Sequence, residues 1–374
     1  MRPIFVLLLL TAAVFAQRHK AASDFDPGKP DGALLMKAVE ENDPLKKAVL
    51  LDQFCAEYPQ NPSTAWALET LQALYVKAGQ YDKIIATGEK LLAIDADDPE
   101  AALQNLKASE NLKDLPGIRK WGTLASANAR KMASEPQPAA AADIDNWKSE
   151  VDYARQVDIY TEYALFRVAV ESRDPKTTIE FAEALEARNP NSQYMGQTRA
   201  ALFLAYRQSG ANDKAVALAE KVVATDQTNE DMLLVVADDH LAKQKEPEKV
   251  HLYAAKAAEI AASKPAPAGV SQADWSTREK ALAGIARYLN GKLYYNEKKW
   301  ADADRELRLA LPLVESNAAV KPEVLFYLGF ANYNLQKHQE AANFYKACAA
   351  IPGAFQAQAT KNLQSLKSLH PGIQ

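Results

Sequence analysis

Residues 282–310 have the sequence LAGIARYLNGKLYYNEKKWADADRELRLA, and residues 320–350 have the sequence VKPEVLFYLGFANYNLQKHQEAANFYKACAA. Both stretches follow one template, in which a first helix ends in a short turn and a second helix follows. The small residues Ala303 and Ala341 occupy the same place in the second helix and lie 38 positions apart. A helical pair repeated at this interval is typical of an array of stacked helix hairpins.

The same unit recurs in weaker form through most of the chain. Near the amino end, a shift of 34 positions brings the apolar pattern around Gly88 into register with that around Gly122. Further along, Thr178, Ala215 and Val250 recur at intervals of 37 and 35. The pattern predicts an all-α solenoid of antiparallel hairpins, about nine in number.

Two segments rich in proline and alanine interrupt the array, at residues 135–142 and 263–271. Each is followed by an acidic residue, a tryptophan and a long helical pattern. Trp147 and Trp275 lie 128 positions apart, and Tyr160 and Tyr288 are separated by the same interval. Two explanations remain open: coincidence in an alanine-rich chain, or duplication of a block of several hairpins.

These interruptions divide the chain into parts. Residues 1–16 are predicted to be a signal peptide, and the polar residues 17–30 are predicted to be a disordered linker. Three groups of hairpins follow, at residues 31–134, 143–262 and 272–368. The last group ends in an amphipathic helix, which we expect to cover the apolar face of the final repeat.

The first residues have the organisation of a secretory signal. Arg2 supplies a positive charge, Ile4–Val14 is apolar, and Ala16 precedes the expected cleavage site. The apolar run is short for a membrane span, and an uncleaved anchor is the alternative. The sequence therefore predicts a bacterial exported protein, periplasmic or secreted, that is cleaved after Ala16.

The composition is that of a globular protein, with 48% hydrophobic and 25% charged residues. The formal net charge is −4, and no cluster of Lys and Arg stands out, so neither nucleic acid nor an anionic membrane is indicated as a partner. The two cysteines, Cys55 and Cys348, fall at core-facing positions of second helices. We expect both to be small buried hydrophobes rather than a disulfide pair.

At these positions the chain resembles the tetratricopeptide repeat family, whose template has Leu-Gly and Tyr on the first helix and Ala, an aromatic and Ala on the second. The match is strong in the last third of the chain and weak around Leu103–Met132, where Ser109 replaces the usual Tyr. The best-matching residues are Leu325, Leu328, Gly329, Ala341, Tyr345 and Cys348. The resemblance implies a right-handed superhelical solenoid.

In that family the first helices of the hairpins line a concave groove in which ligands lie. The same positions in this chain hold many aromatic and cationic side chains, which are the types enriched at interface hot spots. They are Tyr160, Tyr163, Arg167, Arg207, Tyr288, Lys292, Tyr295, Phe326, Phe330 and Tyr333. An extended peptide or an amphipathic helix would fit such a surface. The alternative for each ring is that it packs between hairpins.

The sequence contains no arrangement of residues typical of catalysis. No two of its five histidines lie at metal-ligand spacing on one helix, and there is no phosphate-binding glycine loop. His240 lies beside Asp238 and Asp239, which is the nearest approach to a metal site, and we interpret it as part of a solvated helix face. The sequence therefore predicts a protein without enzymatic activity, cofactor or metal.

Three functions remain in competition. The first is a scaffold or adaptor that binds a peptide or helix of a partner protein in the groove. The second is a glycan-binding or envelope-assembly module, because aromatic faces also stack on sugars and an exported protein meets envelope polysaccharide. The third is an enzyme that uses the repeats only as a scaffold, which requires a catalytic cluster formed by the fold.

Overall fold

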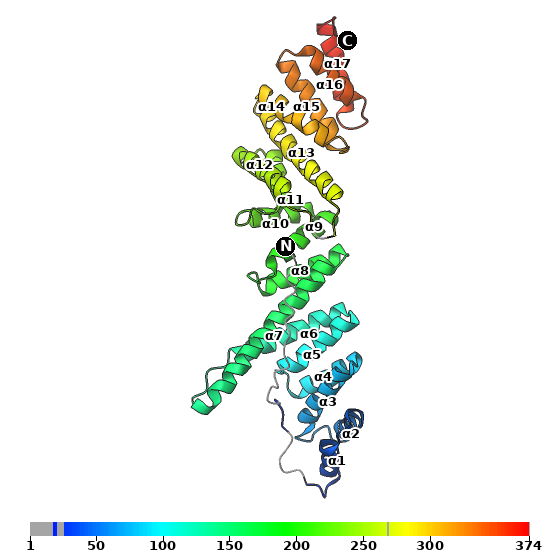
Figure 1. Ribbon diagram of the computed structural model, residues 1–374, viewed down its shortest axis with the longest axis vertical. Helices are drawn as coiled ribbons and strands as arrows, with labels where there is room; N and C mark the ends of the chain where they lie inside the picture. Colours follow the sequence, from blue (N-terminus) through cyan, green and yellow to red (C-terminus); the bar gives the residue numbers. More distant parts are fainter. Residues whose placement is uncertain (1–17, 21–25, 268, 374) are drawn as a thin grey trace. The chain divides into compact units, whose positions relative to one another are not determined.

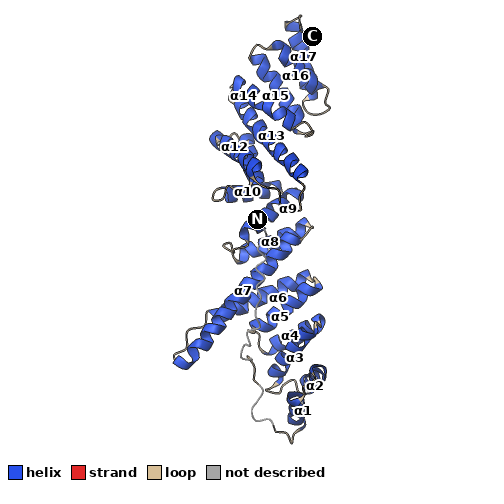
Figure 2. Cartoon of the chain, in the orientation of Figure 1, coloured by secondary structure: helices blue, strands red, loops and turns tan. Residues whose placement is uncertain are grey.

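The computed structural model describes residues 18–20, 26–267 and 269–373. Within these residues the chain is helical, with turns and loops between the helices and no strand (Figure 1, Figure 2). None of these helices is both long enough and apolar enough to cross a membrane. The predicted signal peptide and its cleavage site lie outside the described residues.

The chain divides into two compact units, which meet in sequence between Ala205 and Tyr206. In the amino-terminal unit the helices are α1 Pro30–Glu40, α2 Pro44–Glu57, α3 Thr64–Ala78, α4 Tyr81–Ile94, α5 Pro99–Leu112, α6 Leu115–Ala133, the 3-10 turn η1 Ala141–Asp143, α7 Ile144–Glu171 and α8 Pro175–Arg188. The boundary between the units falls within α9, Met195–Gln208.

In the carboxyl-terminal unit the helices are α10 Asn212–Val223, α11 Glu230–Ala242, α12 Pro247–Ser263, α13 Gln272–Asn296, α14 Trp300–Ala310, the 3-10 turn η2 Leu311–Leu313, α15 Val320–Asn334, α16 His338–Ala349 and α17 Gln356–Leu369. The boundaries of the three hairpin groups expected from the sequence remain a prediction.

Consecutive helices pack as antiparallel pairs. Such pairs are α1–α2, α3–α4, α5–α6 and α7–α8 in the amino-terminal unit and α11–α12, α13–α14 and α15–α16 in the carboxyl-terminal unit. First helices also contact the first helix of the next pair: α3 with α5, α5 with α7, α11 with α13, and α13 with α15. The predicted all-α array is confirmed. The described residues contain seventeen α-helices, which in chain order are enough for eight hairpins and a terminal helix, close to the nine hairpins expected.

Aspartate followed by proline sets the start of three helices. Asp43, Asp98 and Asp174 are the N-caps of α2, α5 and α8, and each side chain accepts hydrogen bonds from two backbone N–H groups of the first turn. A proline follows at the first helical position, where its missing N–H group costs nothing. At the other end of α3, Gly79 adopts the left-handed conformation with φ of 64°, which stops the helix.

Small residues set the distance between the two helices of a hairpin. A Cβ atom on Gly291 of α13 would lie 2.6 Å from Leu307 Cγ on α14, and one on Gly329 of α15 would lie 2.7 Å from the ring of Tyr345 on α16. Ala303 of α14 is fully buried. The helices can therefore approach this closely only because these positions lack a larger side chain.

The region that matches the repeat template least is a regular hairpin of α5 and α6. Ser109, which stands where the family has Tyr, is fully buried. A Cβ atom on Gly117 of α6 would lie 2.5 Å from Ser109 Oγ. The tyrosine is therefore absent because α6 passes too close to this position.

Trp147 and Trp275 make the same contact. Trp147 Nε1 donates to the backbone oxygen of Glu135 at 3.0 Å, and Trp275 Nε1 donates to that of Lys264 at 2.8 Å. Lys264 directly follows α12 and Glu135 lies two residues after the end of α6, and each tryptophan lies in the long helix after the proline and alanine segment. This shared contact favours duplication of a block of hairpins over coincidence.

The predicted disordered linker at residues 17–30 needs a correction for the residues that the structure describes. Arg18 and His19 both donate backbone N–H groups to the carboxylate of Glu69 on α3. Pro30 already belongs to α1. The polar composition of this segment reflects ion pairs with the body of the unit, at least for these two residues, and not disorder.

Both cysteines are buried and free, as expected from the sequence. Cys348 donates its thiol hydrogen to the backbone oxygen of Pro322, with a distance of 3.3 Å from sulfur to oxygen. Burial raises the pKa of each thiol to about 11. Cys55 and Cys348 are therefore neutral thiols at physiological pH.

The close approach of helices at glycine positions can be tested at Gly88 on α4 and Gly122 on α6, which are matched positions of consecutive hairpins. A Cβ atom on Gly88 would lie 2.2 Å from Asn105 Oδ1 and 2.4 Å from Gln72 Nε2, a buried pair that are themselves hydrogen bonded at 3.1 Å. Gly88→Ala should therefore lower the free energy of unfolding by about 1–3 kcal/mol.

Gly122→Ala is the control, because its Cβ would lie 3.7 Å from Leu106, an ordinary contact. This change should be neutral or stabilising by up to about 1 kcal/mol, the helix-propensity gain of Ala over Gly. Urea denaturation followed by circular dichroism measures both. Equal effects of the two changes would contradict the packing argument.

Candidate functional site

In the carboxyl-terminal unit, Glu323 is the centre of a polar network between first helices. Lys292 Nζ on α13 donates to Glu323 Oε1 at 2.7 Å, and Tyr327 OH donates to the same oxygen at 2.9 Å. Lys292 Nζ also donates to Tyr288 OH at 3.1 Å. The network therefore links α13 to α15 through one carboxylate.

The protonation states in this network follow from its contacts. Burial opposes ionisation of Glu323, but hydrogen bonds from Lys292 and Tyr288 outweigh it and lower the pKa of the carboxyl group. Burial raises the pKa of Tyr288 and of Tyr327, and the Glu323 carboxylate raises both further. At neutral pH a carboxylate and an ammonium group therefore face two protonated tyrosines.

Aromatic rings surround this network. Tyr295 lies 4.4 Å from Tyr327, 5.3 Å from Phe330 and 5.8 Å from Trp300, measured between ring centroids. Phe326 is 5.3 Å from Phe355, which precedes α17. These half-buried rings pack against each other between hairpins, so most of their area is used within the fold.

A cavity of about 220 Å³ opens where α15, α16 and α17 meet. Its lining combines aromatic and aliphatic side chains with an amide and a hydroxyl group. The lining residues are Phe330, Tyr333, Tyr345, Asn362, Ser365, Leu366 and Leu369. Tyr333 is 41% exposed and Leu369 is 65% exposed. The cavity thus has a buried floor and an open apolar rim.

In the amino-terminal unit, the carboxylate of Glu110 holds two of the predicted groove residues. Tyr160 OH donates to Glu110 Oε2 at 2.6 Å, and Arg167 Nη2 donates to Glu110 Oε1 at 2.9 Å. The ammonium group of Lys107 lies 5.3 Å from the Tyr160 ring. Burial raises the pKa of Glu110, and the hydrogen bond from Tyr160 and the charge of Arg167 oppose this.

Three further rings, those of Tyr163, Phe166 and Tyr194, form a small cluster with Tyr160 on α7 and just before α9. Phe166 stacks on Tyr194 at a centroid distance of 4.9 Å, and Tyr163 lies 5.8 Å from Tyr194 and 6.2 Å from Tyr160. Tyr194 directly precedes α9. The cluster therefore fixes the chain between α8 and α9 against α7.

Glu110 and Asp238 are separated by 128 positions, the interval that separates Tyr160 and Tyr288. In the first copy the carboxylate accepts the tyrosine hydroxyl group. In the second copy burial and Glu323 are the main causes of the raised pKa of Tyr288, and the charge of Asp238 adds a smaller contribution, while the tyrosine hydroxyl group contacts Lys292. Both blocks thus place an acidic residue near the tyrosine, and in the first copy a hydrogen bond joins the two.

The ten predicted groove residues differ in what they can offer a ligand. Tyr160, Arg167, Tyr288 and Lys292 are engaged in the two carboxylate networks, and Tyr288 is only 6% exposed. Tyr163, Tyr295 and Phe326 pack in aromatic clusters. Arg207 is exposed, and Phe330 and Tyr333 line the cavity. Their role in binding remains a prediction.

The sequence analysis missed the residues that organise these surfaces. Glu323 and Tyr327 lie on the same helix as Phe326 and Phe330, so the projection that selected the rings could have included them. Glu110 lies in the weakly matching hairpin. Leu369 lies in the terminal helix, and no repeat template covers that helix.

His240 does not lie on a solvated helix face, contrary to the prediction. It is 6% exposed, and its ring nitrogens lie 3.6 Å from Glu220 Oε1 and 3.4 Å from Glu246 Oε2. Asp238 is exposed and Asp239 is half-buried. The histidine faces the inside of the helix pair because it lies one turn after Val236 and Ala237, which are buried.

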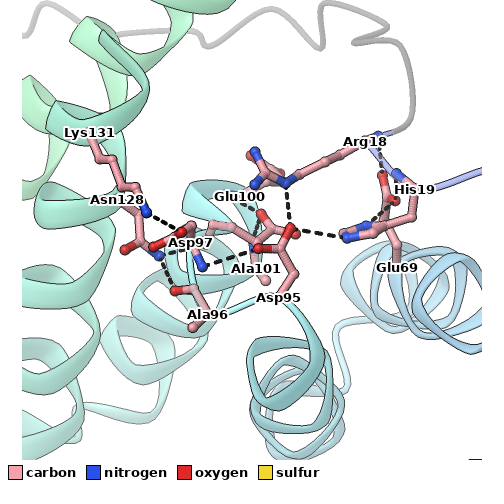
Figure 3. A network of polar contacts seen from close by, with 11 residues as sticks. Arg18, His19, Glu69, Asp95, Ala96, Asp97, Glu100, Ala101, Asn128 and Lys131 are labelled. Carbon is pink, nitrogen blue, oxygen red and sulfur yellow. Dashed lines mark hydrogen bonds and ion pairs between the residues drawn. The ribbon is translucent and has the colours of Figure 1, made fainter. Parts of the chain in front are cut away.

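Among the described residues, His19, Asp95 and Asp98 are the one group whose possible metal-ligand atoms all lie within 4.8 Å of one another. Figure 3 shows His19 and Asp95 together with Arg18, whose Nε atom lies 2.6 Å from Asp95 Oδ2. The sequence spacing of histidines did not indicate this group, because it contains one histidine, and the two aspartates lie more than 70 residues further along the chain, in the turn between α4 and α5.

No protein-family model and no curated protein sequence matches the chain. Among solved structures, the tetratricopeptide repeat domain of P58(IPK) is 13% identical, with 91% of this chain and 98% of that chain covered and a TM-score of 0.28. Yeast Tom70 is 10% identical, with 92% and 97% covered and a TM-score of 0.24. The description of the fold therefore rests on the helix packing given above.

Glu323→Gln should reduce stability at pH 7 by about 1–3 kcal/mol, because it removes a charged acceptor of hydrogen bonds from Lys292 and Tyr327. The folded-state pKa of Glu323 is lowered, so its contribution is present above the ordinary value of 4.5 and is lost as the pH falls. The variant should therefore lose less stability than the wild type between pH 7 and pH 3.5.

Glu315→Gln is the control in the same unit, since its side chain is 65% exposed and its pairing with Lys321 is screened by solvent. Urea denaturation at both pH values measures the effect. The stabilising role of the Glu323 carboxylate would be contradicted if Glu315→Gln lowered the free energy of unfolding as much as Glu323→Gln. It would also be contradicted if the stability of Glu323→Gln depended on pH as that of the wild type does.

Proposed function

We propose that this protein is a non-enzymatic interaction scaffold that binds a peptide or helix of a partner protein through the cavity between α15, α16 and α17. The observation that supports the proposal is the cavity itself, with an exposed rim at Tyr333 and Leu369. Exposed apolar side chains around a hollow are typical of interaction sites. Phe330 and Tyr333, two of the predicted groove residues, belong to its lining.

The size of the cavity indicates what it holds. Its volume of about 220 Å³ is below the roughly 300–1,000 Å³ typical of sites that enclose a small molecule. It suits a single large apolar side chain that projects from a partner segment. Asn362 and Ser365 on α17 supply polar groups that could orient the backbone of that segment.

The buried thiols provide no support for catalysis. Cys348, the cysteine of this unit, is fully buried, and burial raises its pKa to about 11. A neutral, enclosed thiol is a poor nucleophile. The carboxylates of the unit that were described above accept hydrogen bonds within the fold, which suits a structural role.

We propose further that the protein is exported. The support is the sequence alone: a positive charge at Arg2, the apolar run Ile4–Val14 and the small residue Ala16. Intact mass measurement of the protein from its native host should give a chain that begins at Gln17. A chain that retains Met1 would contradict cleavage.

The cavity can be tested at its rim. Tyr333→Ala and Leu369→Ser should each reduce the yield of a specific partner by about tenfold or more, the loss expected when an interface hot spot is truncated. The measurement is quantitative mass spectrometry of proteins captured from native extract by the purified chain. Both residues are exposed, so the variants should keep the fold.

Leu252→Ala is the matched control, because Leu252 is an exposed leucine of the same unit, 53% exposed, on the second helix α12. It should leave the yield of the same partner unchanged. A partner that all three variants retain equally would show that the cavity is not the binding site.

A further inference from the structure

The segment Arg18–His19 is bound to the body of the amino-terminal unit through its backbone. Arg18 N donates to Glu69 Oε1 at 3.3 Å, and His19 N donates to Glu69 Oε2 at 3.0 Å (Figure 3). One carboxylate on α3 therefore accepts two consecutive main-chain N–H groups. The two N–H groups converge on one carboxylate because the chain bends at these residues, and such main-chain contacts do not depend on the side chains.

The side chains of the same two residues meet acidic groups from three elements. Arg18 Nε donates to Asp95 Oδ2 at 2.6 Å, at the end of α4. His19 Nδ1 lies 3.0 Å from Glu69 Oε2, and His19 Nε2 lies 3.2 Å from Asp95 Oδ2. Asp98, at the start of α5, lies within the same group of ligand atoms. The surface thus selects positive charge on both sides of the bend at Arg18 and His19.

This acidic surface is built independently of the segment that occupies it. Asp98 is 2% exposed and accepts N–H groups of Glu100 and Ala101 through Oδ1 as the cap of α5. Asn128 Nδ2 on α6 donates to the backbone oxygen of Ala96 at 2.8 Å, which fixes the turn between α4 and α5 (Figure 3). The position of Asp95 is therefore set by the fold.

A metal ion is the competing occupant of this surface. His19, Asp95 and Asp98 are suitable ligands. However, the guanidinium group of Arg18 occupies the Asp95 oxygen that a cation would use, and it would repel that cation. The observed contacts favour a basic chain segment over a metal.

We propose that Glu69, Asp95 and Asp98 form a docking site for a basic segment of a partner protein, an Arg-His pair in a bend, and that Arg18–His19 occupies this site in cis. A partner segment must displace the chain's own residues before it binds. The site belongs to the amino-terminal unit and does not depend on the cavity between α15, α16 and α17.

The contacts that hold Arg18 and His19 in the site are weak enough for another segment to replace them. The Arg18 side chain is 38% exposed and that of Asp95 is 24% exposed, so solvent and salt screen the pair. A tethered segment competes at an effective concentration of the order of millimolar, which lowers the apparent affinity for an added segment. Removal of the two side chains should therefore raise that affinity.

The probe is a fluorescent peptide with blocked ends, acetyl-Gly-Arg-His-Gly-amide, titrated with the full chain and followed by anisotropy. The variant Arg18→Ala with His19→Ala should bind it at least about tenfold more tightly than the wild type, since the tethered competitor loses its side-chain contacts with Glu69 and Asp95 and keeps only its main-chain contacts. Addition of Glu69→Gln and Asp95→Asn to that variant should abolish binding. A Gly-Glu-His-Gly peptide should not bind to any of these proteins.

Asp82→Asn is the matched control in the same unit. It removes an exposed carboxylate at the first turn of α4, about 20 Å along the helix from Asp95. When it is added to the variant Arg18→Ala with His19→Ala, it should leave the affinity for the peptide unchanged. Circular dichroism checks that every variant is folded.

The pH dependence is a second measurement. The hydrogen bond with Glu69 raises the pKa of His19 above its ordinary value of 6.5, although burial opposes this. The groups that face His19 are Glu69, Asp95 and Asp98, which are all acidic, and Arg18, which is paired with Asp95. A raised pKa in the docked state means that docking is strongest below pH 6.5 and weakens as the pH rises. Peptide affinity should fall between pH 6 and pH 8.

Two results would overturn the proposal. One is an affinity for the peptide that does not rise when Arg18 and His19 are replaced, or that survives Glu69→Gln with Asp95→Asn. The other is stoichiometric binding of Zn²⁺ to the wild-type chain, measured by calorimetry and lost in His19→Ala, which would assign the site to a metal.

Discussion

The structure depends on the close approach of neighbouring helices at positions such as Gly88, Gly291 and Gly329, which have no side chain. The partner that fills the space differs from one hairpin to the next. It is the ring of Tyr345 opposite Gly329, the side chain of Leu307 opposite Gly291, and a buried pair of amides opposite Gly88. The close approach is thus made against an aromatic, an aliphatic and a polar neighbour. Because the constraint is geometric and its solutions are chemically different, the hairpins can diverge in sequence while the array is preserved.

Periodicity in the sequence was sufficient to predict the helices, their pairing and the terminal helix, because a helical face repeats locally and is visible within one segment. The buried cysteines followed for the same reason. What periodicity cannot show is which charged groups from different helices meet. Glu110 binds residues 50 and 57 positions away, and Glu69 binds residues 50 and 51 positions away. His240 looked solvated beside two aspartates, although its own register on α11 turns it inward. The linker was judged from its polarity, whereas two of its charged residues, Arg18 and His19, are paired with the folded unit.

The predicted groove is therefore not one uniform surface. Carboxylates bind some of its side chains within the fold, whereas other side chains of the predicted groove remain exposed. Where Glu110 and Glu323 lie, tyrosine hydroxyl groups and cations are satisfied internally, and their displacement by a ligand would leave a buried charge without partners. Around Tyr333 and Leu369 no such cost exists, because the groups are apolar and exposed. A dense row of aromatics on first helices is thus weak evidence for a binding face until the buried carboxylates beside it are known.

The contacts of Arg18 and His19 with Glu69 and Asp95 also determine how the chain responds to mechanical load. Helices α1 and α2 lie in sequence between these two points of attachment, inside a closed loop. A pull on the amino end is transmitted through Arg18 and His19 directly to α3 and the turn after α4. The first hairpin is therefore shielded from tension until those ion pairs break, and the helices nearest the pulled end are not the first to bear the force.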